Sequence, residues 1–282
     1  MSLFFNTSEK DTGNTILRRH TREPLYSVTQ KAAGRVKIGF VGLAAGAGAT
    51  TLCFAAAEYL ASVFSKQADR SVTMLEIDLR TEAPAGRPYD KIGIDRRFAG
   101  RDFVSLYRLA AEGKPLHRVK NIDGGISWAL RIPGEHGPAP DPTTMHRLMN
   151  NAAGNIVLCD ISAQGILNSS GPVMNREALK ALLADLDHII CIFDPLPSRL
   201  LASVSAAEVC RAAETDGVPV TWVFNKLNAG VNLREATRFT GIKDYTRFPA
   251  VSAEAAYSAE YACRSLASDP EIKAALSNIF SE

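Results

Sequence analysis

The sequence predicts an α/β fold: a doubly wound, mostly parallel sheet with helices on both faces. Apolar segments rich in β-branched residues alternate along the chain with longer segments of helix-forming residues. This alternation is typical of parallel strands joined by helices. A loop of small residues also follows the first apolar segment directly, where such sheets bind ligands. The 282 residues are 46% hydrophobic and 22% charged, as in an ordinary globular protein.

The composition argues against several classes of protein. The formal net charge is only +2, so the chain as a whole is not attracted to DNA or to anionic membranes. No apolar run approaches the ~20 residues of a membrane span, and the first residues, MSLFFNTSEKDTG, lack a signal-peptide pattern. We therefore expect a cytosolic protein. Its five cysteines are scattered without a C-x-x-C pair and its five histidines share no spacing, which disfavours a metal site.

The folded part is expected to begin after a polar leader. Residues 1–34 lack hydrophobic periodicity and are expected to form a flexible arm, and residues 35–282 a single domain. Residues 38–43 are expected to form a central strand. In order along the chain, strands are expected at 35–43, 72–79, 124–133, 155–162, 188–195 and 220–227. Helices are expected at 50–67, 101–113, 143–153, 175–186, 198–217, 232–241, 253–267 and 270–280.

The loop VGLAAGAGATTL, residues 41–52, has the composition of an anion-binding turn. Gly46 and Gly48 let the backbone curl so that its N–H groups converge. Thr50 places a hydroxyl at the helix start, suited to Mg²⁺ or to capping. Small-residue turns also join strands to helices without any ligand, so the loop alone leaves both interpretations open.

This segment resembles the deviant Walker A loop of the ParA/MinD group of P-loop ATPases, a SIMIBI-type family with the pattern K-G-G-x-G-K-T-T. The order of elements extends the resemblance over about residues 35–282, which implies a P-loop NTPase-like fold. The matching positions are Ala44, Ala45, Gly46, Ala47, Gly48, Ala49, Thr50 and Thr51. The resemblance implies that the last six of these bind a nucleotide.

Three more residues match functional positions of that family. Asp78, near the end of the second expected strand, and Asp160, in the Walker B-like stretch NIVLCDISAQG, match its acidic positions, which implies catalytic roles. Thr50 and Asp160 are then the implied Mg²⁺ residues. Asn225, in TWVFNKLN, matches the asparagine that faces adenine. Without the resemblance, an aspartate at a strand end is better explained as a turn cap.

Both lysines of the family pattern are missing. Ala49 replaces the lysine that contacts the β- and γ-phosphates, and Ala44 replaces the one that reaches the partner's nucleotide across a dimer. Losing two hydrogen bonds to charged groups weakens binding by about 3–6 kcal/mol, or ~10² to 10⁴-fold. We therefore expect weak ATP/Mg²⁺ binding and lost ATPase activity. Arg80, Arg96 and Arg97 are the nearest candidates for replacement cations.

The resulting hypothesis is a degenerate ParA/MinD-like protein that positions or assembles other proteins without hydrolysing ATP. The missing lysines, and a tail DPEIKAALSNIFSE unlike the basic membrane helix of MinD, resemble the CpaE/TadZ branch, which localises Flp/Tad pilus machinery. The rival hypothesis is a working ATPase with a rearranged loop, acting in partitioning or spatial organisation.

Protein partners, including a second copy of the chain, are expected. Three clusters of basic residues are better explained as solvent-exposed surface than as a DNA-binding face. They lie at Arg18, Arg19 and Arg22, at Lys114, Arg118 and Lys120, and at Arg234, Arg238, Lys243 and Arg247.

Overall fold

The structure is a computed structural model, which describes residues 35–66, 71–77, 87–116, 119–135, 141–167 and 176–280. The expected arm at 1–34 lies outside this part. Within it, eight strands form one sheet in the order β3-β4-β2-β5-β1-β6-β7-β8. Every neighbouring pair is parallel except β3 and β4. The predicted doubly wound, mostly parallel fold is confirmed. Among the described residues, none of the helices combines the length and the hydrophobicity that a membrane span requires.

The first strand lies in the middle of the sheet, as expected. β1 pairs with β5 on one side and with β6 on the other. Its six residues from Val36 to Val41 are apolar or small apart from Lys37, and most are fully buried, as strands covered on both faces require. The strands are β1 (Val36–Gly42), β2 (Val72–Ile77), β3 (Ile122–Asp123), β4 (Ile126–Ala129), β5 (Ile156–Ser162), β6 (His188–Phe193), β7 (Val220–Leu227) and β8 (Thr246–Pro249).

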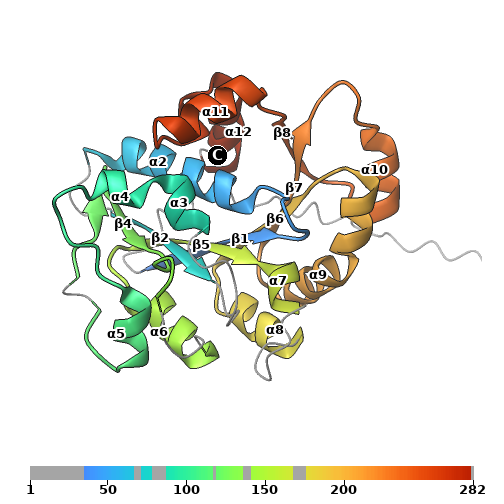
Figure 1. The fold of residues 1–282 in the computed structure, drawn as a ribbon. Coiled ribbons are helices and arrows are strands. Elements are labelled where there is room, and N and C mark those ends of the chain that lie inside the picture. The colour runs from blue at the N-terminus through green and yellow to red at the C-terminus, as the bar shows by residue number, and fades with distance from the viewer. Residues whose placement is uncertain are drawn as a thin grey trace, which may run out of the picture.

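Helices cover both faces of the sheet (Figure 1), and each face has its own apolar core. One layer contains α2 (Ala49–Phe64), α3 (Arg87–Ile92), α4 (Ile94–Arg97), α11 (Ala253–Tyr261) and α12 (Pro270–Phe280). The opposite layer contains α5 (Leu106–Ala111), α6 (Pro142–Asn151), α7 (Ala163–Leu167), α8 (Arg176–Ala184) and α9 (Pro197–Thr215). Helix α10 (Leu233–Thr240) packs on α9, close to the β8 edge.

The structure differs from the sequence-based expectation mainly in short elements. Helices α3, α4 and α7 and strands β3 and β8 were not expected. The helix expected at 253–267 ends at Tyr261, because Cys263 adopts a left-handed backbone (φ 54°) and a short 3₁₀ turn follows at Leu266–Ser268. Helix α6 begins at Pro142 rather than at a threonine, with Asp141 as its N-cap.

Candidate functional site

The small-residue loop connects the end of β1 to the start of α2. Gly46 (φ 75°) and Gly48 (φ 96°) both adopt left-handed backbone conformations that favour glycine. A Cβ on Gly48 would lie 2.3 Å from Asn225 Nδ2, so this close approach also requires glycine. Gly48 caps α2 without a side-chain hydrogen bond. The N–H groups of the first turn have no acceptor within the helix and are directed toward the carboxyl edge of the sheet.

Thr50 and Asp160 are brought together, as the Mg²⁺ prediction requires. Thr50 Oγ1 donates to Asp160 Oδ2 at 2.6 Å. Asp160 is 7% exposed, and the parallel register places it beside Phe40 of β1 and Glu76 of β2. A hydroxyl and a carboxylate are oxygen ligands of the type that Mg²⁺ accepts together with waters and phosphate oxygens. The two residues therefore fit a Mg²⁺ ion bound with a phosphate ligand.

The two alanines at the lysine positions are buried. Ala44 is 5% and Ala49 8% exposed. A Cβ on Gly42 would lie 3.2 Å from the Ala49 methyl group, so the loop packs closely onto the end of β1. Neither position supplies a cation.

A second set of contacts fastens the loop to the ends of β6 and β7. Asn225 Nδ2 donates to the Ala47 carbonyl oxygen at 2.8 Å. The ammonium group of Lys226 donates to the Gly46 carbonyl oxygen at 2.5 Å and pairs with Asp194 Oδ2 at 2.8 Å. Lys226 has a left-handed backbone (φ 59°), uncommon for a residue with a side chain. Lys226 was not predicted as a site residue, although it directly follows the predicted Asn225.

A cavity of 420 Å³ opens beside this loop. Its lining includes Gly48 and the polar residues Thr51, Asp194, Asn225, Lys226 and Asn228. Its apolar lining includes Pro195, Leu196, Val231, Pro249, Val251 and Ile272. An apolar cavity with a few convergent polar groups is the usual form of a small-molecule site. Asn225, which the family resemblance places at the adenine base, also lines this cavity.

A lysine far from the loop in sequence also reaches it. Lys91 Nζ, from α3, donates to Thr51 Oγ1 at 2.6 Å. Only tertiary structure brings these residues together, because α3 lies in an irregular segment without a motif.

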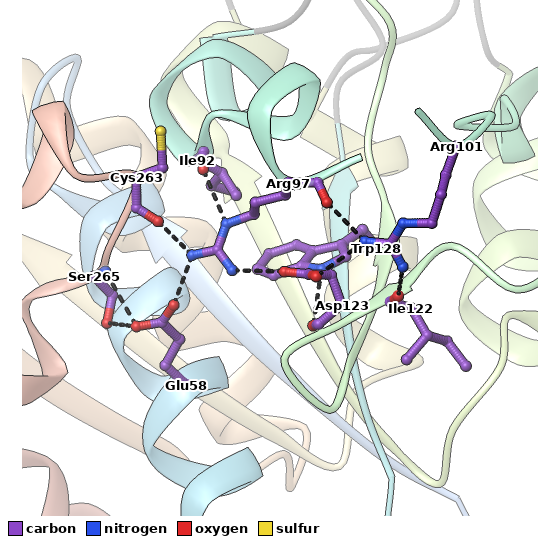
Figure 2. Close-up of polar contacts among 9 residues, drawn as sticks. All are labelled: Glu58, Ile92, Arg97, Arg101, Ile122, Asp123, Trp128, Cys263 and Ser265. Carbon is purple, nitrogen blue, oxygen red and sulfur yellow. Dashed lines mark hydrogen bonds and ion pairs between the residues drawn. The ribbon is translucent and has the colours of Figure 1, made fainter. Parts of the chain in front are cut away.

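Arg96 and Arg97, two of the three arginines considered as replacement cations, bind groups away from the loop. Figure 2 shows Arg97 between Glu58 and Asp123, with N···O distances of 2.8 and 3.1 Å. It also donates to the carbonyl oxygens of Ile92 and Cys263 and lies over aromatic rings of the core. Arg96 donates to the Tyr261 carbonyl oxygen. Arg96 and Arg97 therefore join α4 to neighbouring segments and do not contact the loop. Arg80 and the predicted Asp78 lie outside the described residues.

Among the described residues, the cysteines and the other possible metal ligands form no second site. All five cysteines are free, and all but Cys263 are buried. Burial raises the pKa of Cys53 and Cys191, and raises that of Cys159 to about 12. No group of three or more His, Cys, Asp or Glu residues in the described part could hold a metal ion.

The central sheet, the glycine loop before α2 and the acidic strand end beside it define the class: the chain has a ParA/MinD-like P-loop fold. It resembles a ParA family ATPase from Chlorobium tepidum (TM-score 0.58, 15% identity, 88% of this chain and 97% of the other covered). It is also similar to MinD of the Aquifex aeolicus MinC:MinD complex (TM-score 0.59, 15% identity, 86% of this chain and 93% of the other covered). A third similar structure is Pyrococcus horikoshii MinD with Mg-ADP (TM-score 0.56, 13% identity, 87% of this chain and 94% of the other covered). No protein-family model matches the sequence, and no curated protein is significantly similar to it.

Proposed function

We propose that this protein is a ParA/MinD-like positioning or assembly factor that binds ATP weakly and does not hydrolyse it. The observation that carries the proposal is the contrast within one loop. Its backbone, the Thr50–Asp160 pair and the adjacent cavity are suited to a nucleotide, whereas Ala44 and Ala49 are buried methyl groups where the family pattern has lysines. Hydrolysis needs preorganised positive charge around the transferred phosphoryl group.

In this proposal, different residues bind the phosphates, the Mg²⁺ ion and the base of the nucleotide. The N–H groups from Gly46 to Thr51 hold the phosphates, although that of Ala47 is already donated to the Ala44 carbonyl oxygen. Thr50 with Asp160 holds Mg²⁺. Asn225 lies at the base side, although one of its amide hydrogens is already donated to Ala47. The Mg-ADP bound to the similar P. horikoshii MinD supports this ligand class.

The test is a titration of the purified chain with ATP and Mg²⁺, together with a phosphate-release assay. We expect affinity in about the high micromolar range or weaker, because each missing charged contact is worth roughly 1.5–3 kcal/mol. Phosphate release should equal that of buffer. Tight binding, or hydrolysis abolished by Asp160→Ala, would contradict the proposal.

That contrary result would establish the second candidate function, an active ATPase in partitioning or spatial organisation. The direct Thr50–Asp160 hydrogen bond favours it, because this pair is intact despite the missing lysines.

We also propose that the protein works through protein partners, including a second copy of the chain. Three apolar side chains near the start of α9 support this: Leu196 (55% exposed), Leu201 (68%) and Val204 (40%). Leu196 also lines the cavity, so a partner here would lie beside the nucleotide. Concentration-dependent light scattering that reports a dimer for the wild type and a monomer for Leu201→Lys would support this; identical masses would contradict it.

The finer assignment to the CpaE/TadZ branch, with Flp/Tad pilus machinery as the cellular setting, rests on the missing lysines. DNA is a less favoured partner. Arg234 and Arg238 are exposed on α10, but acidic Glu235 and Asp244 are exposed close to them in sequence.

A further inference from the structure

The nucleotide loop has lost its own cations, but a lysine from α3 reaches it. Lys91 Nζ lies 2.6 Å from Thr51 Oγ1. We propose that Lys91 supplies positive charge to the phosphate groups of a nucleoside di- or triphosphate at this site. The inference rests on the proposed function, because it assigns a ligand-binding role within the same site.

The ion-pair partners of the two nearby lysines point to Lys91 rather than Lys226. The ammonium group of Lys226 is paired with Asp194, which is 3% exposed, so its charge is already compensated. Lys91 is half-buried, and no carboxylate of the described residues forms an ion pair with it; it donates to the neutral Thr51 hydroxyl. A partly desolvated ammonium group without a counter-ion is stabilised by an anionic ligand.

The position of Thr51 explains what Lys91 would contact. Thr51 lies in the first turn of α2 and lines the 420 Å³ cavity. A phosphate oxygen bound by the Thr51 N–H and hydroxyl groups would therefore lie within about one further hydrogen-bond length of Lys91 Nζ. The same cavity is lined by Asn225, so the residue proposed at the phosphates and the residue proposed at the base share one site. The ligand class is thus a nucleotide rather than a free inorganic anion.

The test compares ADP and ATP affinity, by calorimetric titration with Mg²⁺, among single-residue variants of the full chain. Lys91→Met and Lys91→Gln remove the charge, Lys91→Arg keeps it, and Lys243→Met is the matched control at an exposed lysine. Loss of a charged contact predicts about 10-fold or greater weakening for the first two variants. We expect Lys91→Arg within about threefold of wild type and no change for Lys243→Met. The unfolding temperature without nucleotide should be the same in all variants.

Several results would overturn the assignment: equal nucleotide affinity in Lys91→Met and wild type, failure of Lys91→Arg to retain binding, or a lower ligand-free unfolding temperature that accounts for the loss. A wild-type chain that binds neither ADP nor ATP also overturns it, but leaves the proposed positioning role in place. ATP hydrolysis by the wild type has the opposite effect: it contradicts the proposed function and leaves the Lys91 assignment standing.

Discussion

The side-chain amide of Asn225 donates a hydrogen bond to the carbonyl oxygen of Ala47, 178 residues earlier in the chain. This contact fixes the glycine loop against the end of β7, and Lys226 adds a second contact through Gly46. Because parallel strands end at the same edge of the sheet, loops from distant segments meet there. The loop is therefore held in shape by its neighbours, even though it lacks the lysine of the family pattern.

Restoring that lysine tests whether the held loop still accepts phosphate. Ala49→Lys should place an ammonium group beside the first-turn N–H groups and increase ATP affinity by about 10–100-fold, or roughly 1.5–3 kcal/mol. Calorimetric titration measures it. Ala44→Lys is the matched comparison and should change little in a monomer, because its family counterpart acts across a dimer. A well-folded Ala49→Lys variant without any gain would mean that the loop is closed to phosphate.

Arg97 is expected to be important for stability rather than for nucleotide binding (Figure 2). Its side chain is 12% exposed and joins α4 to Glu58 of α2 and to Asp123 of the β3–β4 hairpin. Arg97→Ala leaves Glu58 without its cation and Asp123 with Arg101 alone, so the free energy of unfolding should fall by about 3 kcal/mol. Urea unfolding measures the change. The control is Arg199→Ala, at an exposed position, whose free energy of unfolding should stay within about 0.5 kcal/mol of wild type. Equal stability of the two variants would contradict the interpretation.

The N-cap of α6 should make stability depend on pH. Asp141 accepts a hydrogen bond from the Thr144 N–H at 2.6 Å, which lowers the pKa of its carboxyl group. Asp141→Ala should lower the free energy of unfolding by about 1 kcal/mol at neutral pH. Because the folded-state pKa is the lower one, this difference is present above the unfolded pKa of about 3.9 and disappears as the pH falls through the folded value. Asp141→Asn keeps the acceptor and should remove most of the pH dependence; urea unfolding at several pH values tests both.

The cysteines should differ sharply in reactivity. Burial raises the pKa of Cys53, Cys159 and Cys191, so almost no thiolate forms on them near pH 8. Cys263 is half-buried and is the only one of the five that is not fully covered. Iodoacetamide should therefore modify Cys263 alone in the native protein and all five cysteines after unfolding, as measured by mass spectrometry. Rapid native labelling of Cys53 would show instead that α2 opens beneath the loop.

The sequence by itself determined the alternation of strands and helices, the place of β1 within the sheet and the loop before α2. These features depend on local hydrophobic patterns and on glycine, whose backbone freedom is needed at Gly46 and Gly48 whatever surrounds them. The two-residue β3 and the edge strand β8 were not predicted, because such short segments show almost no hydrophobic periodicity. Thr50 and Asp160 could be paired from sequence only through the family resemblance.

Only the tertiary structure decided which cations reach the loop. From sequence, Arg96 and Arg97 were as good candidates as any, yet packing directs Arg97 toward Glu58 and Asp123 and brings Lys91 to Thr51 instead. The physical reason is that a side chain's charge is visible in the sequence, whereas its direction and its counter-ion are set by the packing of elements distant along the chain. Lys226 and Asp194, whose ammonium and carboxylate groups lie 2.8 Å apart at the ends of two adjacent strands, depend in the same way on the parallel pairing of β6 with β7.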